Sequence, residues 1–284
     1  MASLKDIYTE FIDCLRQHRW EDLGGFLHPN FTKGNKVYTP RSFADESRDN
    51  GDTEIQLDSV TVDYKGQKLA STILVRWKPS RRVMGFDPPG KPIIFVEQHF
   101  NWFVDEKLSR TITMSDRAAI HRQLSNPDGD YAPDLVSNQA QAEVLVKATE
   151  DAAVANLAEV YRAYIQCIND RTLDDDLDKF AHAQVIFDGI VLTRDEFRER
   201  LKSVIVAIPD LVQVIYTIIA DDNTSRLAAQ LESSGTLVKP LAGLAATNSE
   251  VRFAEHCTYE FRDGKITRIW SLANWGKLGE TTIE

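Results

Sequence analysis

The amino-acid sequence contains two related halves. At an offset of 154 residues, identical residues recur in the same order, as His28 and His182, Val37 and Val191, Thr39 and Thr193, and Phe43 and Phe197. At an offset of 158 the identities continue, as Glu97 and Glu255, Phe103 and Phe261, Asp105 and Asp263, Lys107 and Lys265, and Arg110 and Arg268. A period this long exceeds the repeat lengths of solenoid proteins, so it indicates a tandem copy of a whole domain.

Each half is long enough to bury a hydrophobic core of its own. We expect a first domain at residues 1–124, a polar, proline-containing linker at 125–142, and a second domain at 143–284. The change of offset from 154 to 158 is explained by a loop insertion near Ile208-Pro209-Asp210 in the second half.

Composition narrows the classes of partner. Hydrophobic residues make up 43% and charged residues 27% of the chain, as in soluble globular proteins, and the net charge is −10. Nucleic-acid and anionic-membrane binding both require clustered Lys and Arg, so neither is expected. No apolar run reaches the length of a membrane span and the first residues lack a signal core, which predicts a cytoplasmic protein. Its three cysteines, Cys14, Cys167 and Cys257, are expected to be reduced.

Each half places helical patterns before strand patterns. Apolar residues recur at helical spacing near the start of each half, and Thr39 and Thr193 look like helix N-caps. Strand patterns follow at 55–64, 69–77, 93–104 and 107–114 in the first half, and at 212–220, 225–233, 251–262 and 265–272 in the second. This order predicts the α+β class, with two tandem barrels, each a curled antiparallel sheet with helices on its concave side and a pocket between them.

A motif in the second half resembles a known family. Phe261-Arg262-Asp263-Gly264-Lys265-Ile266, followed by Trp270-Ser271-Leu272-Ala273-Asn274, is similar to the SnoaL-like polyketide cyclases, and the resemblance covers residues 154–279. It implies the cone-shaped barrel of the nuclear-transport-factor-2-like superfamily. It also implies an acid/base Asp four residues after the motif Trp. This chain has Asn274 there, whereas the first half has Asp116 at the equivalent position.

Strand alternation predicts a candidate catalytic group in the first half. If the last hairpin has a two-residue turn and no irregularity, Glu97, His99 and Asp116 share the concave face. Two neighbouring carboxylates would raise one pKa, which suits proton transfer near neutral pH. The structural alternative is that Glu97 pairs with Arg110 or Lys107 while Asp116 caps a helix at 117–124.

The same register predicts the site of the second half. Cys257 then faces Trp270 and Glu255 faces Leu272, so that Glu255 and Asn274 are candidate catalytic residues, as base and hydrogen-bond donor. The substrate-binding candidates are Trp270, Leu272, Cys257, Tyr259, Tyr164 and His182. The alternative for His182 is a capping or partly buried histidine.

Together these features predict a small-molecule enzyme. No metal-ligand spacing, glycine-rich phosphate loop or nucleophile motif occurs, so no cofactor and no metal are expected. We expect a cofactor-independent cyclase or isomerase that uses acid/base chemistry (aldol-type cyclisation, isomerisation or dehydration) on a small apolar polyketide- or terpenoid-type metabolite. A non-catalytic binding or interaction protein of the same fold is the alternative. The two domains are expected to pair as an intrachain pseudo-dimer, and a homodimer is also compatible.

Overall fold

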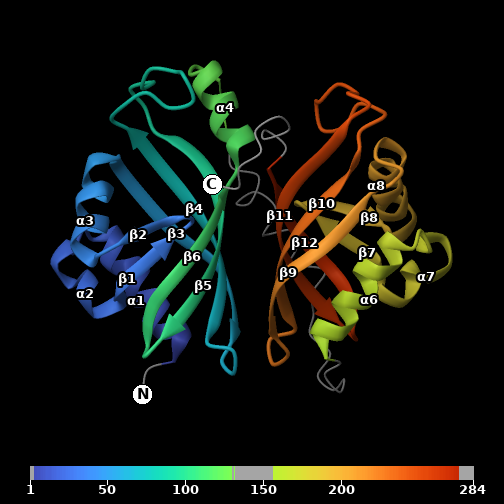
Figure 1. Cartoon of the computed structure of the whole chain (residues 1–284), viewed down its shortest axis with the longest axis horizontal. Coiled ribbons are helices and arrows are strands. Elements are labelled where there is room, and N and C mark those ends of the chain that lie inside the picture. The colour runs from blue at the N-terminus through green and yellow to red at the C-terminus, as the bar shows by residue number, and fades with distance from the viewer. Residues whose placement is uncertain (1–2, 130, 132–155, 275–284) are drawn as a thin grey trace. The chain divides into compact units, whose positions relative to one another are not determined.

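The computed structural model describes residues 3–129, 131 and 156–274 (Figure 1). It contains two compact units, each built around one six-stranded sheet. Most of the predicted linker at 125–142 and the start of the predicted second domain at 143 lie outside the described residues. The domain boundaries and the pairing of the two domains therefore stay predictions.

The first domain places four helical segments before its long strands β3 to β6. Its strands are ordered β2-β1-β6-β5-β4-β3, and it ends on a helix that packs on β5. The elements are α1 (Leu4–Arg16), η1 (Trp20–Asp22), α2 (Leu23–Phe26), β1 (Leu27–Lys33), β2 (Lys36–Tyr38), α3 (Pro40–Asp49), β3 (Gly51–Asp63), β4 (Lys68–Pro79), β5 (Ile93–Val104), β6 (Lys107–Ser115) and α4 (Arg117–Ser125).

The second domain repeats this arrangement. Its sheet has the order β8-β7-β12-β11-β10-β9, which is the order of the first sheet element for element. The elements are α6 (Leu157–Asn169), α7 (Leu173–Phe180), β7 (Ala181–Phe187), β8 (Ile190–Thr193), α8 (Arg194–Ala207), β9 (Val212–Asp221), β10 (Arg226–Thr236), β11 (Glu250–Arg262) and β12 (Lys265–Ala273). The duplication and the α+β class are confirmed.

One pairing in each sheet differs from the predicted antiparallel meander. β1 runs parallel to β6, and β7 runs parallel to β12, whereas all the other pairings are antiparallel. The sequence of β1 and β7 is short and partly polar, so it gave only a weak strand signal. These strands matter because β1 carries Lys33 to the face on which the first cavity lies.

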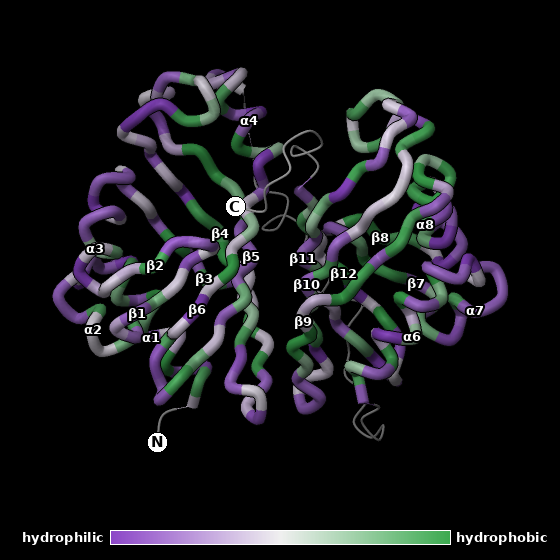
Figure 2. Tube along the Cα trace, in the orientation of Figure 1, coloured by the Kyte–Doolittle hydropathy of each residue, from purple (hydrophilic) through white to green (hydrophobic). Residues whose placement is uncertain are grey.

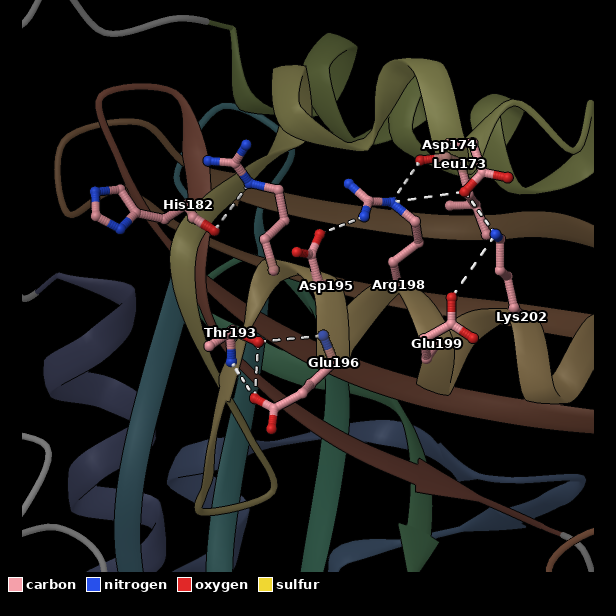
Figure 3. A network of polar contacts seen from close by, with 10 residues as sticks. Leu173, Asp174, His182, Thr193, Asp195, Glu196, Arg198, Glu199 and Lys202 are labelled. Carbon is pink, nitrogen blue, oxygen red and sulfur yellow. Dashed lines mark hydrogen bonds and ion pairs between the residues drawn. The ribbon is translucent and has the colours of Figure 1, made fainter.

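The helices form because each has a polar start and an apolar face. Thr39 and Thr193 cap α3 and α8 as predicted, and the Thr193 hydroxyl accepts a hydrogen bond from the Glu196 amide (Figure 3). The apolar face of α1, with Tyr8 and Phe11, is buried against strand residues such as Leu69. The outer helices α3 and α7 are largely hydrophilic (Figure 2). Each helical layer therefore covers one face of its own sheet.

The last hairpin of each domain contains a bulge that changes its register. The tight turn at Asp263 and Gly264, both with positive φ, forms as predicted. One extra residue, Thr267, then follows in β12, and its hydroxyl donates to the Glu260 carbonyl at 3.1 Å. Ser109 makes the equivalent bond, to the Trp102 carbonyl at 3.0 Å. A bulge of this kind shifts every later pair by one residue.

The predicted register is therefore wrong beyond the bulge. Cys257 lies opposite Ser271, not opposite Trp270, and Glu255 lies opposite Ala273, not opposite Leu272. Because neighbouring residues of a strand point to opposite faces, Trp270 and Leu272 lie on the face away from Glu255. Three other residues of β12 share the face of Glu255, namely Ile269, Ser271 and Ala273.

Candidate functional site

The first domain encloses a cavity of about 510 Å³ between its helices and the concave face of its sheet. Its walls are largely aromatic, with Phe11, Trp20, Phe31, Phe43, Trp77 and Phe95. Its floor is polar, because β1, β5 and β6 contribute Lys33, Glu97, His99, Asn101, Thr111, Thr113 and Ser115. The cavity combines a large apolar volume with a small set of polar groups, as ligand sites do.

Glu97 and His99 form a hydrogen-bonded pair on this floor. His99 Nε2 lies 3.0 Å from Glu97 Oε2, and the Ser115 hydroxyl donates to Glu97 Oε1 at 2.5 Å. Burial raises the pKa of Glu97, but the hydrogen bond and charge of His99, with Lys33 and Ser115, outweigh it and lower the pKa to about 2. Glu97 is therefore ionised at neutral pH and holds the imidazole in place.

Tyr8 extends this pair towards the helices. Its hydroxyl lies 3.4 Å from His99 Nδ1 and 2.7 Å from the Ser71 hydroxyl. Burial raises the pKa of Tyr8 to about 12, so the phenol stays neutral at physiological pH. The result is a continuous polar chain from Tyr8 through His99 and Glu97 to Ser115.

Asp116 does not join this chain, so the predicted pair of Glu97 and Asp116 is wrong. Glu97 lies opposite Ser115, and Asp116 follows β6 as the N-cap of α4. Its carboxylate accepts a hydrogen bond from the Ala119 amide at 2.9 Å. The capping alternative is confirmed, whereas the charge partner of Glu97 is His99 and not Arg110 or Lys107.

The second domain encloses a smaller cavity of about 360 Å³ at the equivalent place. Glu255, Cys257 and Tyr259 from β11 form its floor, and Tyr164 from α6 lines it as predicted. The longer helix α8 adds Arg200, Leu201, Ser203 and Val204 to its walls. Most of the other lining residues are aliphatic, so Glu255 is a carboxylate in largely apolar surroundings.

Glu255 is held by hydroxyl and amide groups. The Ser233 hydroxyl donates to Glu255 Oε1 at 2.6 Å, and Gln213 Nε2 donates to the Ser233 oxygen at 3.1 Å. Burial raises the pKa of Glu255, and hydrogen bonds from Ser233 and Gln213 offset this only in part. Burial also raises the pKa values of Cys257, Tyr164 and Tyr259. The cavity thus holds a carboxylate of raised proton affinity beside thiol and phenol groups, and Asp188 and Arg200 also line it.

A network of ion pairs fixes α8 over this cavity (Figure 3). Arg198 Nε donates to the Leu173 carbonyl at 3.2 Å, and Lys202 Nζ lies 2.5 Å from Asp174 Oδ1. Both contacts join α8 to α7. Arg194 Nε donates a hydrogen bond to the His182 carbonyl at 3.4 Å. The His182 imidazole points away from this network, and His182 does not line the cavity.

Several predicted residues lie outside the second cavity. Trp270 and Leu272 lie on the opposite face, and Asn274 follows β12 with its backbone amide bonded to the Ala254 carbonyl at 3.0 Å. The lining residues that sequence reasoning missed include Gln213 and Ser271 here, and Asn101 and Thr113 in the first cavity. It also missed Ser233 and Tyr8, which bond to the lining residues Glu255 and His99. A signal for the bulge was present, because the buried Ile266 and Ile269 are three residues apart, where a regular strand requires an even spacing.

Within residues 3–129, 131 and 156–274, no group of three or more His, Cys, Asp and Glu side chains is arranged to hold a metal ion. In the same ranges, no helix has the length and apolar composition needed to cross a bilayer.

Solved structures similar to this chain each cover less than half of it. A SnoaL-like polyketide cyclase from Agrobacterium tumefaciens is 29% identical, with a TM-score of 0.41, over 43% of this chain and 94% of its own. IdmH from Streptomyces antibioticus is 14% identical, with a TM-score of 0.38, over 44% and 96%. AclR from Streptomyces galilaeus is 17% identical, with a TM-score of 0.38, over 46% and 100%. No curated protein matches the chain.

One family model matches the second domain. The model of the SnoaL-like polyketide cyclases matches residues 158–278, which run from α6 through β12 and include the whole cavity around Glu255. Because the first domain repeats the same strand order, the chain carries this fold twice. The second domain is similar to the SnoaL-like polyketide cyclases, and this match spans less than half of the chain.

Proposed function

We propose that the protein is a cofactor-independent cyclase or isomerase that acts on a small apolar metabolite of polyketide or terpenoid type in the second-domain cavity. The observation that carries this proposal is Glu255, a half-buried carboxylate with a raised pKa in a largely apolar cavity. A raised pKa makes a carboxylate a stronger base, which brings it closer to the range useful for proton transfer at neutral pH. The match of residues 158–278 to the model of the SnoaL-like polyketide cyclases supports the substrate class.

The geometry supports a proton-transfer mechanism. Ser233 donates to Glu255 Oε1, and in the proposed step the carboxylate removes a proton from a carbon next to a substrate carbonyl. The electron pair of the broken C–H bond moves to the carbonyl oxygen as an enolate, to which a neutral Tyr164 or Cys257 can donate a hydrogen bond. The enolate carbon then attacks a second carbonyl of the same molecule, or the proton on Glu255 returns to a different carbon.

Exchange of solvent deuterium tests this proposal without knowledge of the natural substrate. A 1,3-diketone carrying a naphthyl ring serves as the probe, and mass spectrometry measures deuterium at its acidic carbon above the uncatalysed rate. Glu255→Gln keeps the shape but removes the titratable group, so the catalysed rate is expected to fall by about 10²- to 10⁴-fold. In the wild type, the rate should fall as the pH drops through the raised pKa of Glu255.

The control is the matched carboxylate of the other domain. Glu97→Gln should leave the exchange rate unchanged, because Glu97 lies in the first cavity. Asn274, at the position where the resemblance implies an acid/base Asp, favours the alternative of a non-catalytic binding protein. Exchange no faster than in buffer, with the probe still bound, would support that alternative and contradict the proposal.

A further inference from the structure

The two cavities differ at the positions that form their floors. Beyond the shared Glu97 and Glu255, the first domain has His99, Asn101, Thr111, Thr113 and Ser115 where the second has Cys257, Tyr259, Ile269, Ser271 and Ala273. The first domain also has the larger cavity, with two tryptophans in its walls. The first cavity is therefore built for a more polar ligand than the second.

Two polar groups on the first floor lack partners. Asn101 is fully buried, and its Oδ1 accepts from the Thr111 hydroxyl at 2.8 Å. Its Nδ2 lies near enough to the Tyr8 phenol to lower the pKa of Tyr8 but makes no hydrogen bond of normal length and angle with a described residue. The hydroxyl of Thr113 is buried and makes none either. Both residues line the cavity, and an unpaired buried donor normally costs free energy unless something fills the position. The missing partner is a hydrogen-bond acceptor.

The strand register places these two groups close together. Thr113 lies directly opposite His99, and Asn101 is two residues along β5 from His99 on the same face. Diagonal neighbours of this kind are within side-chain reach of one shared atom. The nearby Tyr8 hydroxyl already has Ser71 at 2.7 Å, and Glu97 already has His99 and Ser115. Asn101 and Thr113 are thus the fully buried donors of the floor that remain for a ligand.

We propose that the first-domain cavity is a second ligand site, which binds a planar aromatic ketone by directing its carbonyl oxygen at Asn101 Nδ2 and the Thr113 hydroxyl. The aromatic walls, with Trp20, Phe43 and Trp77, supply the contact area for the ring system. The carbonyl oxygen supplies the acceptor. This site goes beyond the proposed function, because it uses no residue of the second domain and needs no proton transfer.

Binding of a matched pair of probes tests the site. 2-Acetylnaphthalene presents a ketone oxygen, and 2-ethylnaphthalene has nearly the same shape without it. Titration of the full chain, followed by calorimetry and by quenching of tryptophan fluorescence, should show the ketone binding about 10-fold more tightly than the hydrocarbon. This factor corresponds to one or two hydrogen bonds to otherwise unpaired donors.

Variants locate the preference. Thr113→Val should remove most of the 10-fold preference while leaving the affinity for the hydrocarbon unchanged. The double variant Asn101→Leu, Thr111→Val replaces both members of a buried hydrogen bond with apolar groups, which limits the loss of stability, and should remove the rest. Ser271→Ala changes the position in the second cavity that matches Thr113. It should leave the 10-fold preference for the ketone unchanged.

Two results would overturn the proposal. Equal affinities of the wild type for ketone and hydrocarbon would show that the unpaired donors do not select a ligand. A loss of ketone affinity in Ser271→Ala equal to that in Thr113→Val would place the bound ketone in the second cavity. Circular dichroism of each variant keeps these results separate from unfolding, and the Thr113→Val result decides alone if the double variant does not fold.

Discussion

Glu97 and Glu255 occupy the same position in two copies of one fold, and their pKa values move in opposite directions. Glu97 lies in β5 and Glu255 in β11, which are interior strands of their sheets. Glu97 lies opposite Ile73, and Glu255 lies opposite Leu231. Burial raises both pKa values, but His99 pairs with Glu97 and lowers its pKa to about 2, whereas Cys257 stands at the matching position beside Glu255. One side chain, two residues along the strand, therefore decides whether the carboxylate is a fixed charge or a base.

The largest expected effect comes from exchanging that side chain. In His99→Cys, burial of Glu97 remains while the hydrogen bond and charge of the imidazole are lost. Because Lys33 and Ser115 still lower it, the pKa of Glu97 should rise from about 2 towards its ordinary value of 4.5, a change in proton affinity of more than about 10-fold. Titration of the ¹³C-labelled side-chain carboxyl, observed by NMR, measures this shift.

The reciprocal variant is the matched control. Cys257→His should lower the pKa of Glu255. The pH below which the deuterium exchange rate falls should then also be lower. Unchanged carboxyl titrations in both variants would contradict the view that the residue at this position sets the two pKa values.

The effect on stability should also differ between the two carboxylates. The pKa of Glu97 is lowered on folding, so its contribution is present above pH 4.5 and is lost as the pH falls towards 2. Glu97→Gln should cost about 1–3 kcal/mol at pH 7 and little near pH 2. The pKa of Glu255 is raised on folding, so Glu255→Gln should not destabilise the protein at pH 7.

Urea unfolding of both variants at a series of pH values checks this prediction. In Glu97→Gln the unfolding transition of the first domain should change. In Glu255→Gln the transition of the second domain should change. A loss of stability in Glu97→Gln that is the same at pH 2 and pH 7 would mean that the Glu97 and His99 charges do not stabilise the fold.

The smallest effect is expected at the bulge that the two domains share. Thr267→Val removes the hydroxyl that bonds to the Glu260 carbonyl, and Ser109→Ala removes the one that bonds to the Trp102 carbonyl. Each should lower the free energy of unfolding by about 0.5–1.5 kcal/mol, the usual net value of one such hydrogen bond. Thermal unfolding provides the measurement, with Thr258→Val in the neighbouring strand as a substitution that leaves the bulge intact.

Much of the fold could be predicted from the sequence because it depends on local and repeated signals. The bounds of β5 and β11 lie within one residue of those expected, and the caps at Thr39 and Thr193 form as expected. These features depend on alternation and on residues within one helical turn. The parallel strands β1 and β7 were missed because their pairing joins segments far apart in the chain.

The candidate site could be predicted only in part because it depends on register. Glu97, His99, Glu255, Cys257 and Tyr259 precede the bulge, and all of them face their cavities. The residues predicted beyond it, such as Trp270 and Leu272, face away, because a single extra residue reverses the alternation. Contacts between helix and sheet, such as that of Tyr8 with His99, leave no sequence pattern at all.

The shared bulge also orders events in the history of the chain. Ser109 and Thr267 hold the same place in both halves, and each bonds to the same point of the preceding strand. An extra residue gained after duplication would be present in one half alone, so the simplest history puts it in the single-domain ancestor. His99 and Cys257 differ, so that position changed after the copies separated. The bulge is thus older than the chemical difference between the cavities of the two domains.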